Sequence, residues 1–129
     1  MESIEETMTT PQYQKTRDII KKTLFPTLRK NGFIARMNFS CCSTCASYEL
    51  TQVAKEKKID SVVFYHQQDE DHFKTNGSVH LRYFSMLDDS LHPEAQREVG
   101  QKISEIAKGS GLKVDWNGLS SQCIQVTAE

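Results

Sequence analysis

The chain has 129 residues, a length suited to one domain that encloses a single hydrophobic core. Lys and Arg number 16 against 17 Asp and Glu, which leaves a net charge of -1 and no basic excess for a phosphate backbone. No apolar run approaches the roughly 20 residues of a membrane helix, and the acidic N-terminus lacks the basic start of a secretory signal. These features argue against nucleic-acid and membrane partners and predict a cytoplasmic protein.

A helix is predicted from Pro11 onward, with an apolar stripe that ends near Leu28. Asn31-Gly32 supplies its stop signal. Pro26 lies inside the pattern, lacks an amide proton and clashes with the carbonyl four residues back. A kink or break is therefore expected near Phe25.

The middle of the chain alternates between strand and helix patterns. A strand is predicted over residues 33–39 and a helix over 44–58. Residues 61–66 are nearly continuous in apolar and aromatic side chains, which indicates a central strand. Residues 67–77 are polar and are expected to form a loop, and the alternation over 78–84 predicts the next strand.

The last part of the chain combines a helix with a hairpin. The helix is predicted over residues 93–108. Alternating runs flank Asn117-Gly118, the signature of a type I′ hairpin. A two-residue loop would pair Leu112 with Cys123 and put both on one face of the sheet. The apolar Ile124 and Val126 would then lie on or beside the opposite face, so either both faces are covered or a bulge changes the register of the last strand.

These elements predict an α+β fold in one domain, residues 11–129, preceded by a disordered tail, residues 1–10. The order is α-β-α-β-β-α-β-β, with five strands in one mixed sheet and three helices. The first strand–helix–strand step implies a parallel pair, and the two hairpins imply antiparallel pairs.

Three of the four cysteines are clustered, at Cys41, Cys42 and Cys45, and Cys123 lies far along the chain. An even number would suit two disulfides in a secreted scaffold. A bridge between the neighbours Cys41 and Cys42 would close a strained ring, however, and no export signal accompanies it. In a reducing cytoplasm such a cluster is typical of metal binding, redox chemistry or simple burial.

The cluster lies between a strand and a helix, where free amide protons and the helix dipole stabilise a thiolate. In a redox interpretation, Cys42 or Cys41 attacks and Cys45 resolves. In a metal interpretation, the three thiolates bind an ion such as zinc, with Cys123 or His66 as the fourth ligand. In a third interpretation, the cysteines are small hydrophobic residues that fill the junction between strand and helix.

A second group of candidate residues follows the central strand. His66 ends that strand, and Asp69 lies in the acidic segment beyond it. If the first two strands are parallel, this segment and the cysteine loop leave the sheet at the same edge. His66 would then serve as base or ligand and Asp69 would orient it, unless the segment is only a solvated acidic loop. His80 and Arg82 alternate outward and are expected to be surface or cross-strand partners.

Two blocks of the sequence resemble a bacterial family of uncharacterised domains. They are Asn38-Phe39-Ser40-Cys41-Cys42-Ser43-Thr44-Cys45 and Val63-Phe64-Tyr65-His66-Gln67-Gln68-Asp69. Members of that family share an N-F-x-C-C-x-x-C block followed by a V-F-Y-H-x-Q-D block. This chain departs from the pattern in having Ala46 after the last cysteine, where members have glycine, and Glu70-Asp71 after the second block, where members continue with Thr-Glu. The resemblance marks a region and implies no reaction.

Together these patterns predict a small thiol protein that binds a metal or changes redox state. The catalytic candidates are Cys42, Cys45, His66 and Asp69, and the metal candidates are Cys41, Cys42, Cys45, Cys123 and His66. The partner would be a protein or a small molecule, and the pattern does not decide whether the chain is an enzyme. The alternative hypothesis is a non-enzymatic binding or structural module whose cysteines are buried.

Overall fold

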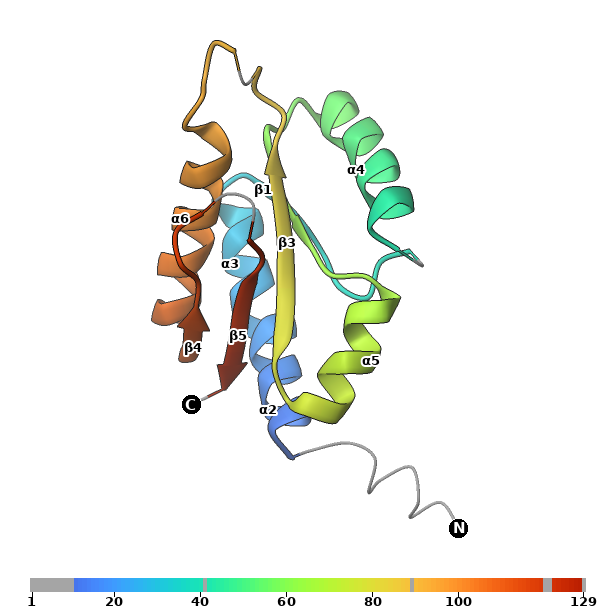
Figure 1. The fold of residues 1–129 in the computed structure, drawn as a ribbon, viewed down its shortest axis with the longest axis vertical. Helices are drawn as coiled ribbons and strands as arrows, with labels where there is room; N and C mark the ends of the chain where they lie inside the picture. The colour runs from blue at the N-terminus through green and yellow to red at the C-terminus, as the bar shows by residue number, and fades with distance from the viewer. Residues whose placement is uncertain (1–10, 41, 89, 120–121, 129) are drawn as a thin grey trace.

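The computed structural model describes residues 11–40, 42–88, 90–119 and 122–128, which form a five-stranded mixed sheet with helices on both faces (Figure 1). The strands are β1 (Phe33–Arg36), β2 (Ser61–Phe64), β3 (Val79–Ser85), β4 (Leu112–Asp115) and β5 (Ile124–Ala128). Their order in the sheet is β1-β2-β3-β5-β4, with β1 and β2 parallel and the other pairs antiparallel. The predicted α+β class with a mixed sheet is confirmed. The tail predicted over residues 1–10 lies outside the described residues.

The helical segments are α2 (Pro11–Ile19), the π-helix η1 (Ile20–Leu24), α3 (Phe25–Lys30), α4 (Ser43–Lys57), α5 (Gln67–Asn76) and α6 (Ala95–Gly109). The predicted three helices correspond to the continuous α2–η1–α3 segment, α4 and α6, so α5 is additional. In Figure 1, α3 and α6 lie on one side of β3, and α4 and α5 lie on the other. None of the helices in the described ranges has the length and apolar character needed to cross a membrane.

The first helical segment changes its hydrogen-bond pattern near Pro26 but remains continuous. The amide of Phe25 donates to the carbonyl of Ile20, five residues back, and Pro26 occupies the first turn of α3. A π-type turn of this kind accommodates the missing donor and the crowded carbonyl that proline creates. The predicted kink near Phe25 is thus a local widening of one continuous helix, which ends at Asn31 as expected.

The prediction that residues 67–77 form a loop is wrong, because Gln67–Asn76 is the helix α5. His66 and Asp69 cap its start reciprocally, and Gly77, with φ of +78°, ends it. The usual start signal has Ser or Thr at the first position of such a cap, so a histidine there does not indicate a helix. The segment is otherwise polar, and Phe73 is its only large buried apolar side chain.

The register predicted for the last two strands is also wrong. Leu112 pairs with Ala128 rather than with Cys123, and the two strands are joined by a connection from residue 116 to residue 123. The hydroxyl of Tyr83 anchors this connection, lying 3.2 and 2.9 Å from the carbonyl oxygens of Leu119 and Gln122. The longer connection lets both strands turn their apolar residues to one face, and it moves Cys123 to the opposite face.

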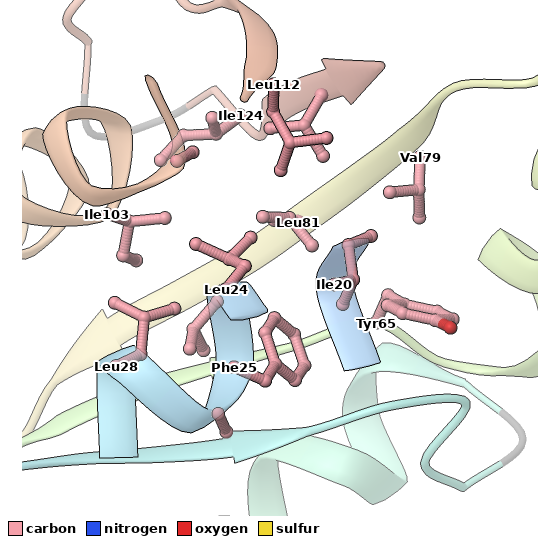
Figure 2. Packing of buried hydrophobic residues seen from close by; sticks show 14 of the residues in the cluster. Ile20, Leu24, Phe25, Leu28, Tyr65, Val79, Leu81, Ile103, Leu112 and Ile124 are labelled. Atoms are coloured by element: carbon pink, nitrogen blue, oxygen red, sulfur yellow. The ribbon is translucent and has the colours of Figure 1, made fainter. Parts of the chain in front are cut away.

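Two hydrophobic clusters lie on the two faces of the sheet. The larger cluster, part of which is drawn in Figure 2, packs Ile20, Phe25 and Leu28 against Ile103 of α6 and Leu81 of β3. The smaller cluster lies between α4 and the other face, and it contains Ile34, Ala46, Leu50, Ala54, Val62 and Phe64. On that second face, the polar side chains of β4 and β5 remain exposed or half-exposed.

Candidate functional site

The cysteine loop and the start of α5 meet at one edge of the sheet. Because β1 and β2 are parallel, both chain segments leave the sheet in the same direction. The amide of Phe39 donates to the carbonyl of Tyr65 over 2.9 Å, and the amide of Gln67 donates to the carbonyl of Ser40 over 3.0 Å. The convergence expected from the sequence is therefore confirmed at the level of the backbone.

The segment between β1 and α4 is conformationally constrained. Asn38 and Ser40 have φ angles of +49° and +66°, in the left-handed region that non-glycine residues seldom occupy. These two reversals end the strand at Arg36, earlier than the predicted residue 39, and turn the chain into α4. The segment thereby places Cys42 and Cys45 at the N-terminal end of that helix.

Two described cysteines bracket the first turn of α4. Cys42 is its N-cap, with extended backbone angles, and Cys45 is the third residue of the helix. Cys42 is half-buried and Cys45 is exposed. A spacing of three residues puts them on one side of the helix, close to the amide groups of its first turn. Cys41 lies outside the described residues.

His66 and Asp69 form the reciprocal cap of α5. The amide of Asp69 donates to His66 Nδ1 over 3.3 Å, and the amide of His66 donates to Asp69 Oδ2 over 3.3 Å. Burial lowers the pKa of His66, an effect that Asp69 opposes and Arg82 reinforces. His66 Nε2 also lies 3.4 Å from Asp69 Oδ2. With a lowered pKa, this approach joins a neutral imidazole to a carboxylate and is not an ion pair.

Arg82 completes this group by binding a carboxylate of α5, whereas the sequence predicted a surface or cross-strand residue. Its Nε and Nη2 donate to the two carboxylate oxygens of Asp69 over 2.8 and 3.1 Å. Asp69 is buried, whereas the Arg82 side chain is 33% exposed. The hydrogen bonds to Asp69 raise the pKa of Arg82 further, so the guanidinium remains charged. The pair could be anticipated only by knowing that residues 67–76 form a helix beside β3.

Cys123 is the remaining cysteine, and it faces Arg82 and Asp69 rather than the core. Burial raises its pKa, and the positive charge of Arg82 counteracts part of that effect. In the fold without a bound ion, the thiol is therefore protonated at neutral pH. Within residues 11–40, 42–88, 90–119 and 122–128, no three His, Cys, Asp or Glu side chains are arranged to hold a metal ion.

A family model described as Domain of unknown function (DUF6891) matches residues 12–129, from the second residue of α2 to the end of the chain. The chain belongs to this family. The resemblance to an uncharacterised domain family is thus confirmed. No curated protein and no solved structure matches the chain.

The DUF6891 domain also contains a buried polar group that the sequence did not reveal. The hydroxyl of Tyr13 donates to Glu70 Oε2, whereas Glu70 Oε1 and the hydroxyl of Tyr65 are buried without a hydrogen-bond partner among the described residues. Burial and the Glu70 carboxylate raise the pKa of Tyr13 to about 12 and raise that of Tyr65 still further. In Figure 2 the Tyr65 hydroxyl points away from the other labelled side chains.

This arrangement predicts opposite outcomes for two similar substitutions. Tyr65→Phe removes a buried hydroxyl that has no hydrogen-bond partner of normal geometry among the described residues, so the free energy of unfolding should stay unchanged or rise by up to about 1 kcal/mol. Tyr13→Phe removes the hydrogen bond to the buried Glu70 carboxylate and should lower that free energy by about 1–3 kcal/mol. Urea unfolding of the two variants measures both values, and an equal loss in both would contradict the assigned hydrogen bonds.

The buried cap predicts that stability falls on mild acidification. Because the pKa of His66 is lowered in the fold from about 6.5, the unfolded chain binds this proton at higher pH than the folded chain does. Stability should therefore decrease as the pH falls through about 6.5 and below, until the folded-state pKa is passed.

Denaturant unfolding at several pH values between about 7.5 and 5 measures this slope. His66→Asn keeps a side-chain acceptor for the Asp69 amide and removes the titrating group, so the slope should become shallower. His72→Asn, at an exposed position of α5, should leave the slope as it is. A slope that responds equally to both substitutions would show that His66 is not the group responsible.

Proposed function

We propose that this domain is a small cytoplasmic dithiol protein in which Cys42 and Cys45 alternate between two thiols and one disulfide. The observation that carries the proposal is the placement of two cysteines, Cys42 at the N-cap and Cys45 in the first turn of α4, the second of them exposed. Positive potential at a helix N-terminus favours the thiolate form of a cysteine, which is the reactive form.

The exposure of the two thiols suggests an order of events. Cys45, the exposed thiol, attacks as the thiolate on one sulfur of a partner disulfide, which forms a mixed disulfide with that sulfur and releases the partner's other sulfur as a thiolate. Cys42, half-buried one turn away, then attacks Cys45 Sγ and releases the partner's second thiolate. Two electrons pass to the partner, its two sulfurs take up two protons, and the domain keeps the new disulfide. A cytoplasmic thiol of the glutathione class would return the pair to the reduced state.

His66 and Asp69 enter this proposal as positioning residues. Their side chains cap α5. The adjacent amide of Gln67 donates a hydrogen bond to the carbonyl of Ser40, which lies two residues before Cys42. A neutral His66 whose Nδ1 accepts a hydrogen bond from the backbone is suited to fixing the loop. The cap thus supports the geometry of the loop that carries the cysteines.

The proposal is tested by mass spectrometry of the full chain, purified without reductant or chelator and then equilibrated with mixtures of reduced and oxidised glutathione. We expect an intramolecular disulfide, detected as the loss of two hydrogen masses, that links Cys42 to Cys45 in the digested protein. Cys42→Ser and Cys45→Ser should each abolish it, and Cys123→Ser, the matched control, should retain it.

Three results would contradict the proposal. A bound transition metal that is lost on acidification would assign the cluster to metal binding, and zinc would be the first ion to consider. Thiols that react with alkylating reagents only after unfolding would favour a non-enzymatic binding or structural module. A disulfide that persists in Cys42→Ser and joins Cys41 to Cys45 would remove Cys42 from the pair.

A further inference from the structure

The two edges of the sheet differ in how their outer backbone groups are covered. β1 forms one edge and β4 forms the other. At the β1 edge, Arg29 Nε and Nη2 of α3 donate to the carbonyl of Ala35 over 3.2 and 2.7 Å. At the β4 edge, no hydrogen bond to the outer side of the strand is formed within residues 11–40, 42–88, 90–119 and 122–128. β4 is therefore an open edge, to which a further strand can be added.

Hydrogen bonds at the end of β5 show which backbone groups of β4 point outward. The amide of Ala128 donates to Thr16 Oγ1 over 2.8 Å, and the same hydroxyl donates to the carbonyl of Gly77, just before β3, over 3.3 Å. The carbonyl of Ala128 accepts from Gln12 Nε2, also of α2. The backbone groups of Ala128 thus point to the β3 side of β5 and away from β4. Its register partner Leu112 therefore makes no ladder bond with it, and the backbone groups of Leu112 point to the open edge.

Alternation along the strand extends this result to the rest of β4. The amides and carbonyls of Leu112 and Val114 point outward, whereas those of Lys113 and Asp115 point to β5. The side chains of Lys113 and Asp115 are exposed, and in the described part of the chain neither makes a hydrogen bond or an ion pair. The open edge thus carries backbone donors and acceptors together with two unpaired opposite charges.

These charges are complementary to a second copy of the same strand in one register. In an antiparallel pair centred on Val114, the outward amide and carbonyl of each Val114 bond to those of the other copy. Lys113 of each copy then faces Asp115 of the other, in a non-hydrogen-bonded pair with Cα atoms about 4.5 Å apart, where side chains are closest.

The neighbouring registers are unfavourable. A pair centred on Lys113 places two lysines opposite each other, and a pair centred on Asp115 does the same with two carboxylates. A lysine alone on an edge strand discourages pairing. A lysine and an aspartate two residues apart instead favour one register and a partner that carries the same two charges.

From these observations we propose that β4 pairs antiparallel with β4 of a second copy, about a twofold axis at Val114, and joins two five-stranded sheets into one. The interface lies at the edge opposite β1 and the cysteine loop, so it does not depend on the dithiol function. One short strand buries less than the roughly 1,200 Å² of a stable complex. The dissociation constant should therefore lie between about 10 μM and 1 mM.

The test is sedimentation velocity of the full chain from micromolar to millimolar concentration, with a reductant present so that intermolecular disulfides do not contribute. We expect a monomer that becomes a dimer. Lys113→Asp and Asp115→Lys should each weaken association by about tenfold or more, because each replaces two opposite-charge pairs by two like-charge pairs. The double variant exchanges the charges and should restore association. Lys74→Asp, the matched control at an exposed lysine of α5, should associate as the unsubstituted chain does.

Hydrogen exchange of the backbone amides tests the same register independently. The amides of Leu112 and Val114 point outward, so they should exchange rapidly at micromolar concentration and slowly at millimolar concentration. The amides of Lys113 and Asp115 already point to β5, and their exchange should depend much less on concentration.

The proposal is overturned if the chain stays monomeric at millimolar concentration, or if a dimer forms that neither charge reversal weakens. Failure of the double variant to restore association would exclude the register centred on Val114. Slow exchange of the Leu112 and Val114 amides in the dilute monomer would show that another segment of the same chain covers this edge. Cys42→Ser should associate as the unsubstituted chain does, which keeps this test separate from that of the dithiol proposal.

Discussion

Asp69→Asn is expected to lower the free energy of unfolding by about 2–3 kcal/mol. Asp69 is buried, and its carboxylate accepts two hydrogen bonds from Arg82 and one from the amide of His66. An asparagine would turn an amide N–H₂ toward one of these donors and leave Arg82 without a counter-ion. The loss is smaller than for a fully buried pair because the Arg82 side chain is 33% exposed and water partly solvates it.

Urea unfolding of Asp69→Asn beside Asp71→Asn measures this effect. Asp71 lies two residues later on α5 and is exposed, so its substitution should change the free energy of unfolding by about 0.5 kcal/mol or less. If Asp69 also positions the dithiol loop, Asp69→Asn should shift the glutathione ratio at which the disulfide is half formed, and Asp71→Asn should not. Equal effects of the two substitutions would exclude the buried ion pair as the anchor of α5.

The sequence alone was sufficient to predict the elements whose apolar residues recur at the spacing of a helix or a strand. Val99, Ile103 and Ala107 of α6 recur at helical spacing, and all three are buried. The same holds for β3, whose alternate residues Val79 and Leu81 face the core. These patterns report burial on one face, which is the property that most directly determines where an element packs.

The hairpin was predicted wrongly because it depends on contacts between distant residues, and α5 was missed because its local signals are unusual. Asn117-Gly118 favours a two-residue turn locally, but the hydroxyl of Tyr83 holds a longer connection and the core requires Leu112 to lie opposite Ala128. The helix α5 carries too few apolar residues for a helical stripe, and its start is encoded in a cap that uses a histidine.

The candidate site was predictable only in part, for the same reason. The meeting of the cysteine loop with the His66 segment follows from the topology of a strand–helix–strand unit, which the sequence does indicate. The partners Arg82, on the following strand β3, and Tyr13, on the first helix α2, come from other elements and contact side chains of α5. No local pattern could identify them while residues 67–76 were regarded as a loop.

Phe73→Ala is expected to have the largest effect of all, lowering the free energy of unfolding by about 3–5 kcal/mol. Phe73 is fully buried and meets the rings of Tyr13 and Tyr65 edge to face at 4.7 and 5.9 Å. It is the only large apolar side chain that α5 contributes to the core. Truncation would therefore leave a cavity where α5, α2 and β2 meet, beside the buried carboxylate of Glu70.

The appropriate control is Tyr48→Ala, which removes a 69% exposed aromatic side chain from α4 and should cost about 0.5 kcal/mol or less. Hydrogen exchange of the α5 amides should accelerate in Phe73→Ala well before the amides of α6 are affected, because a polar helix with one apolar anchor opens locally when that anchor is lost. A loss below about 1 kcal/mol would mean that the segment is held by its caps alone. In that case the polar pattern of residues 67–77, and not the packing of Phe73, would be the better guide to its stability.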